Sequence, residues 1–134
     1  MLFFTNKNVD INYLEEDNLI SVNWKGYQTL ETIQNGMEEL IKCFQEFSTG
    51  CLLIDNRQIK GTWTMANDWI VTDWTPRAKK FGYHSAAFIF SDDVFSRFSI
   101  KRYIEEYNDG IYMQSFSEEE NAIKWLNEKQ SVEA

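Results

Sequence analysis

The chain has 134 residues, of which 43% are hydrophobic and 25% charged, the size and composition of one folded domain. Its formal net charge is -8 and no run of basic residues offsets it, which argues against nucleic-acid binding. Neither a signal peptide nor an apolar stretch long enough to cross a bilayer is visible, so we expect a cytoplasmic protein without membrane insertion.

The first third of the chain predicts a β-hairpin followed by a long helix. Residues 9–13 and 19–24 alternate between apolar and polar side chains, as half-buried strands do. Over residues 30–47 apolar side chains recur at three- and four-residue steps, which predicts an amphipathic helix. Thr29 is its expected N-cap, and Gly50 is the expected stop.

The rest of the chain predicts strands that alternate with helices. Residues 51–54 and 85–90 are unbroken apolar runs, typical of central strands covered on both faces, and residues 111–116 alternate like an edge strand. Helical patterns cover residues 63–82, the segment from Val94 to just before Gly110, and the segment after a capping box at residues 117–120. A hairpin followed by βα units predicts an α/β fold, a single domain over residues 1–134 with a mixed, largely parallel five-stranded sheet.

The segment 63–82 carries two tryptophans whose place is not explained by one helix face. Met65, Ala66, Trp69 and Ile70 share the expected buried face, and Thr75-Pro76 is expected to break or restart the helix. Trp63 and Trp74 lie off that face, and exposed aromatics often mark interfaces. We therefore expect these two indoles to form either a weak homodimer patch or one side of a ligand groove.

Motifs for catalysis, cofactors and metals are absent from the sequence. There is no nucleophile elbow, P-loop, dinucleotide fingerprint or metal-ligand cluster. The single histidine, His84, opens a buried strand, and the two cysteines, Cys43 and Cys51, fit apolar positions as reduced thiols. The chain is expected not to be an enzyme and to use no cofactor or metal.

Two loops are the expected functional surface, because ligands and partners of α/β sheets meet the loops at the carboxyl ends of the strands. These loops are residues 55–63 and 91–98. Their candidate partner or ligand residues are Asn56, Arg57, Lys60, Trp63, Phe95, Arg97 and Phe98, with Trp74 added from the neighbouring helix. Alternatively, Asp55 and Arg57 tie down their own loop while Trp63 and Phe98 fill the core.

Three stretches resemble small bacterial SpoIIAA-like, STAS-related proteins. They are Ile20–Tyr27 (ISVNWKGY), Asp55-Asn56-Arg57 followed by Gly61 and Trp63, and Ser91–Phe98 (SDDVFSRF). The resemblance extends from about residue 9 to residue 128 and implies a mixed sheet with βα units wound as a superhelix, in agreement with the order of elements above.

The resemblance implies a non-enzymatic interaction or regulatory module with a protein partner. In anti-sigma-factor antagonists of this group the switch is a phosphorylated Ser or Thr in an Asp-Ser-Ser-Gly-type loop. This sequence departs from that pattern: its loop reads Asp55-Asn56-Arg57 and holds no such Ser pair. Thr62 and Thr64, which lie beside this loop near Lys60, are the candidate phosphoacceptors. The group also borders on lipid-binding domains of the same general shape. This leaves a second hypothesis: a carrier or sensor of a small apolar or amphipathic ligand.

Overall fold

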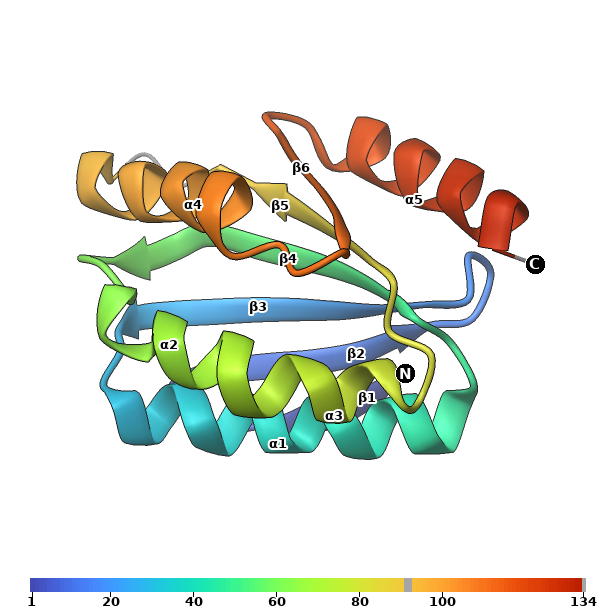
Figure 1. The fold of residues 1–134 in the computed structure, drawn as a ribbon, viewed down its shortest axis with the longest axis horizontal. Helices are drawn as coiled ribbons and strands as arrows, with labels where there is room; N and C mark the ends of the chain where they lie inside the picture. The colour runs from blue at the N-terminus through green and yellow to red at the C-terminus, as the bar shows by residue number, and fades with distance from the viewer. Residues whose placement is uncertain (91–92, 134) are drawn as a thin grey trace.

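A six-stranded sheet runs through the molecule, and its strands lie side by side in chain order (Figure 1). The computed structural model describes residues 1–90 and 93–133. The strands are β1 Leu2–Thr5, β2 Val9–Leu14, β3 Leu19–Tyr27, β4 Cys51–Lys60, β5 Ser85–Ile89 and β6 Tyr112–Phe116. β1, β2 and β3 pair antiparallel, whereas β3 to β6 pair parallel. The predicted mixed sheet is confirmed, with one strand more than expected.

The additional strand is β1, a four-residue edge strand that the sequence pattern did not reveal. Its register with β2 is interrupted between Leu2 and Phe4, so strict alternation is lost over so short a run. Phe3 holds it in place by an edge-to-face contact with Phe47, with ring centroids 5.9 Å apart. A strand this short is defined by its partners rather than by its own periodicity.

Helices cover both faces of the sheet. They are α1 Leu30–Phe47, the consecutive turns η1 Thr64–Ala66, α2 Asn67–Trp69, η2 Ile70–Trp74 and α3 Thr75–Lys79, then α4 Val94–Glu106 and α5 Glu119–Glu133. Side chains of α1, of the η1–α3 segment and of α4 share one core with Leu52 of β4, whereas α5 packs with Leu53 in the second core. Successive residues of a strand point to opposite faces, so α5 covers the face that the other helices leave.

Both ends of α1 are fixed by specific contacts. The Thr29 hydroxyl accepts the Thr32 N–H at 3.1 Å and the Thr32 hydroxyl accepts the Thr29 N–H at 2.9 Å, so the predicted N-cap is confirmed as a reciprocal box. The helix ends at Phe47, and its C-cap is Ser48, with φ +50°, rather than the expected Gly50. A Cβ on Gly50 would lie 1.9 Å from the carbonyl oxygen of Gly82, so this glycine permits a close backbone crossing instead.

The helical segment after β4 continues through the proline without a break. Residues 70–74 form a π turn in which the Thr75 N–H donates to the Ile70 carbonyl, so Pro76 enters a helix already under way. The buried face therefore advances in four-residue steps through Ala66, Ile70, Trp74 and Ala78. Met65, expected inside, is 49% exposed.

This shift of the buried face corrects the expectation for two tryptophans. Trp63 and Trp74 are buried in the first core, and the Trp74 indole N–H donates to the Met37 carbonyl at 2.7 Å. The exposure of the two indoles, from which a homodimer patch and a ligand groove were expected, is therefore wrong. The π turn carries Trp74 inward, whereas Trp63 lies before this turn and packs edge-to-face against Trp24, with ring centroids 6.2 Å apart.

Candidate functional site

The two predicted loops meet at the carboxyl ends of the parallel strands. Asp93 precedes α4, and its carboxylate accepts the Phe95 N–H at 2.8 Å, which caps the first turn of the helix. The same carboxylate accepts the Gly61 N–H at 2.8 Å and thereby ties the loop after β4 to α4. Ser91 and Asp92 of the predicted second loop lie outside the described residues.

Five of the predicted surface residues are exposed at this end: Arg57, Lys60, Phe95, Arg97 and Phe98. Phe95 and Phe98 are 65% and 68% exposed, and Val94 beside them is also open to solvent. Tyr27, at the end of β3, pairs with Lys60 and extends the exposed aromatic surface. We call Tyr27, Lys60, Val94, Phe95, Arg97 and Phe98 the α4 surface.

Arg57 forms a bidentate ion pair with Asp55, its nitrogens Nε and Nη2 lying 3.0 and 2.7 Å from the carboxylate oxygens. Partial burial acts to raise the pKa of Asp55, but the hydrogen bonds and charge of Arg57 outweigh it, and the pKa is lowered. The pair restrains the end of β4. The sequence analysis offered this as an alternative, in which Asp55 and Arg57 tie down their own loop while Trp63 and Phe98 fill the core. That alternative is right for Asp55, Arg57 and Trp63, and wrong for Phe98, which lies on the surface.

Asn56 belongs to the interior and not to the predicted surface. Its side chain is fully buried, and neither its amide nitrogen nor its oxygen has a hydrogen-bond partner. The indole nitrogen of Trp63 and the hydroxyl of Ser99 are also buried without partners and line the same small space. Each such atom costs about 1–3 kcal/mol, so this cluster is expensive to maintain.

The two candidate phosphoacceptors follow β4: Thr62 lies in the turn between β4 and η1, and Thr64 is the first residue of η1. Thr64 is exposed at the start of η1, Thr62 is half-buried, and their hydroxyl oxygens lie 3.5 Å apart.

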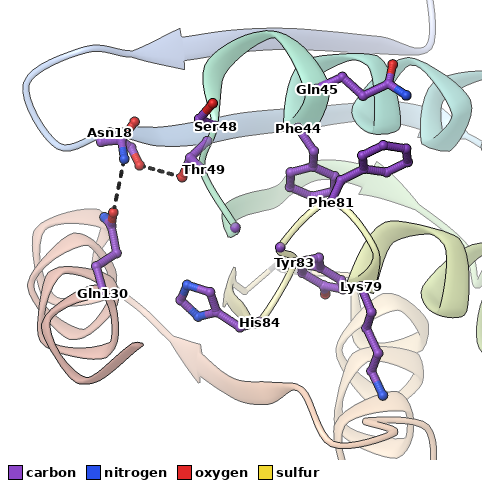
Figure 2. A pocket seen from close by; sticks show the side chains of 12 residues that line it. Asn18, Phe44, Gln45, Ser48, Thr49, Lys79, Phe81, Tyr83, His84 and Gln130 are labelled. Carbon is purple, nitrogen blue, oxygen red and sulfur yellow. Dashed lines mark hydrogen bonds between the residues drawn. The ribbon is translucent and has the colours of Figure 1, made fainter. Parts of the chain in front are cut away.

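An open pocket lies at the other edge of the sheet, at the amino ends of the strands (Figure 2). It has a volume of about 770 Å³ and collects residues that immediately precede β3, β4 and β5, together with the ends of α1, α3 and α5. Its lining comprises Asn18, Phe44, Gln45, Ser48, Thr49, Gly50, Lys79, Phe81, Gly82, Tyr83, His84 and Gln130. Sequence reasoning missed it because it followed the carboxyl ends of the strands; polar residues just before each strand were the available signal.

The polar groups of this pocket are largely engaged with one another. The Thr49 hydroxyl donates to the Asn18 carbonyl at 2.6 Å, and the Asn18 amide donates to Gln130 at 3.4 Å, as Figure 2 shows. His84 lies with Nδ1 2.6 Å from the Ser85 hydroxyl and Nε2 3.9 Å from the Cys51 sulfur.

The Cys51–His84 pair lacks the electrostatics of an activated nucleophile. Cys51 is fully buried, and burial raises the pKa of its thiol to about 12. Reactive cysteines instead have a lowered pKa and partial exposure. At neutral pH Cys51 is thus a protonated, enclosed thiol.

The interior between the helices is nearly filled. The space around Trp63, Trp74 and Tyr103 amounts to about 10 Å³, room for one water molecule at most. Phe98 does not face it. Over residues 1–90 and 93–133 no helix has the length and hydropathy to span a bilayer, and no three potential metal ligands lie together.

The sequence matches no family model and no curated protein. The structure does match a solved one. The chain has the SpoIIAA/STAS fold: a mixed sheet in which an antiparallel start is followed by parallel βα units. One matching structure is that of the anti-sigma factor antagonist SpoIIAA in its unphosphorylated form, with a TM-score of 0.54 and 8% identity over 93% of this chain and 94% of that chain. At this identity the likeness concerns the fold, and the resemblance drawn from the sequence is confirmed at that level.

Proposed function

We propose that the chain is a non-enzymatic, cytoplasmic regulatory module that binds a protein partner through the α4 surface. The observation that carries the proposal is the group of exposed apolar side chains on the first turns of α4, Val94, Phe95 and Phe98. Side chains of this kind are costly in water and enriched at the centre of interfaces. The fold supports the same class of function, because one solved structure with this fold is that of an anti-sigma factor antagonist.

Charge favours a partner with an acidic rim around an apolar centre. Lys60 and Arg97 flank the aromatic side chains, although the chain as a whole has a net charge of -8. Arg97 also lies over the Phe90 ring at 5.1 Å, which holds its guanidinium beside the surface. Opposite charges at a rim speed association and make it salt-dependent.

Phosphorylation of Thr62 or Thr64 belongs to the same proposal. Both flank the loop that Asp93 ties to α4, and the exposed Thr64 hydroxyl is open to a kinase. A phosphate there would add about two negative charges close to the basic rim and weaken the binding of an acidic partner. Phosphopeptide mapping across growth conditions tests it, and unmodified threonines under every condition would remove this part.

The experiment compares capture of partners from the native cell by three forms of the chain. In Phe95→Ser/Phe98→Ser the centre of the α4 surface is lost, while both positions are exposed and the fold should persist. The control is Phe81→Ser, a 41% exposed phenylalanine that lines the pocket at the amino ends of the strands. We expect one partner to be retained by the wild type and the control, and lost by the double variant and at high salt. Equal capture by all three would contradict the proposal.

A further inference from the structure

A closed space lies between β4, the turn after it and α4. It is lined by Asn56, Ile59, Gly61, Trp63, Ser99 and Ile100. Four polar atoms of this lining have no hydrogen-bond partner: both side-chain heteroatoms of Asn56, the indole nitrogen of Trp63 and the hydroxyl oxygen of Ser99. All three side chains are more than nine-tenths buried. Native proteins leave few such atoms, and each needs a physical reason.

The sequence builds this lining with an irregularity in β4. Asn23 pairs with Asp55 and Lys25 with Gln58, so β4 has one residue more than β3 over this stretch. The extra residue is a β-bulge, and bulges re-aim side chains. Here the chain turns inward with Asn56 and again with Ile59, while Arg57 and Gln58 remain exposed.

Water does not satisfy these atoms in the conformation observed, because the space does not admit a water-sized molecule. An occupant therefore requires one wall to move outward. The start of α4 is one such wall: its described side chains Val94, Phe95 and Phe98 are exposed, whereas Ser99 is buried. Elements that move on binding are drawn from such weakly packed segments.

We propose that this space is the closed form of a binding site for a small neutral molecule whose head is a primary amide or a group with the same hydrogen bonds. The Asn56 amide and the Trp63 indole supply donors that need an acceptor, and the Asn56 oxygen needs a donor. A primary amide supplies both. A charged head is disfavoured because the lining holds no ionisable side chain to compensate it.

The apolar part of the ligand follows from the same lining. Ile59, Ile100 and the Trp63 ring surround the polar atoms. A short alkyl chain on the amide therefore has apolar surface along its way out. This site uses other atoms than the α4 surface, so each proposal stands or fails separately.

The test is an NMR titration of the full ¹⁵N-labelled chain with hexanamide, and with hexanoate and hexylammonium as charged counterparts of equal length. The indole N–H of Trp63, assigned by its loss in Trp63→Phe, reports on the site among the five tryptophans. We expect hexanamide to shift this signal and the Asn56 side-chain amide saturably. The two charged probes should bind at least about ten-fold more weakly.

Variants distinguish a binding site from an interior whose polar atoms simply lack hydrogen-bond partners. Asn56→Leu keeps the volume and removes the unpaired atoms, so it should abolish hexanamide binding while its melting temperature stays equal or rises. Asn67→Leu is the matched control, because Asn67 is equally buried, has an unpaired oxygen and lies outside the lining, and it should bind like the wild type. Should Asn56→Leu fail to fold, Ser99→Ala should still weaken binding several-fold.

The proposal is overturned if hexanamide leaves the Trp63 signal unmoved, or if Asn56→Leu and Ser99→Ala bind it as the wild type does. It is also overturned if a crystal structure grown with hexanamide shows ordered water only on these atoms.

Discussion

The Trp74 indole is 1% exposed and joins α1 to the helical segment that follows β4, through its hydrogen bond to Met37. Trp74→Ala should therefore lower the free energy of unfolding by about 3–5 kcal/mol, because it removes a large core side chain and its hydrogen bond to α1. Urea unfolding followed by circular dichroism measures this loss. Phe81→Ala, at a 41% exposed ring, should change stability little. A fully stable Trp74→Ala protein would mean that the indole is not a core residue.

The two thiols are predicted to be inert in the folded chain. Burial, and to a lesser extent the charges of Glu39 and Glu46, raise the pKa of Cys43 to about 12, and burial alone does so for Cys51. At pH 8 both thiols are protonated and enclosed, so iodoacetamide should leave the native protein unlabelled. Mass spectrometry should show two labels once urea is added. Fast native labelling of Cys51 would reopen the question of a reactive Cys51–His84 pair.

At the scale of elements, the crossing of α1 over β3 depends on a glycine. A Cβ on Gly36 would lie 2.6 Å from the tip of the Trp24 ring, and Gly36 is buried within the helix. Alanine at an ordinary helix position gains about 1 kcal/mol over glycine. Here the clash should exceed this gain, and Gly36→Ala should destabilise the chain by about 1–3 kcal/mol.

The neighbouring position provides the control for this prediction. Asn35 is exposed on the same helix, so Asn35→Ala should leave stability unchanged or raise it by about 0.5 kcal/mol. Chemical denaturation of the two variants side by side measures the difference. If Gly36→Ala were as stable as Asn35→Ala, the close approach of α1 to Trp24 would be disproved.

Elements with a long, regular period could be predicted from the sequence. The residues of α1 repeat over five turns, and the parallel strands are marked by runs such as Cys51–Ile54, so the order of elements followed directly. The η1–α3 segment could not be assigned to the correct face, because its π turn changes the period between Ile70 and Trp74. A single extra backbone step moves every later side chain around the helix.

The candidate site was predictable only in its exposed part. Lys60, Phe95 and Arg97 lie at the carboxyl ends of the strands, as topology requires. The inward direction of Asn56 comes from a bulge whose existence depends on how β4 pairs with β3, and no local pattern encodes it. The pocket around His84 arises where three strands begin, so it too is a property of the assembled sheet.

For the molecule as a whole, the buried ionisable groups predict a loss of stability at alkaline pH. The pKa values of both thiols and of the Tyr83 and Tyr103 phenols are raised, mainly by burial. Thiols of the unfolded chain ionise near 9.0 and phenols near 10.0. Above pH 9 the unfolded chain thus releases protons that the folded chain keeps, and stability falls by up to about 1.4 kcal/mol per pH unit for each such group.

Urea midpoints at pH 7, 8.5 and 10 measure this dependence. Stability should be nearly constant between the first two values and clearly lower at the third. A variant with Cys43→Ala and Cys51→Ala should lose less between pH 8.5 and 10, since only its phenols remain to titrate. An identical loss in both proteins would show that the thiols do not contribute.

The strand order β1 to β6 also determines how the sheet can form while the chain is being synthesised on a ribosome. Every strand pairs with the one synthesised just before it, so each new strand finds its neighbour already present and is added at the open edge. No later strand has to be inserted between two earlier ones, as happens in sheets whose order changes direction. The nascent chain can therefore extend its sheet during translation, and only α5, made last, completes the cover of the second face.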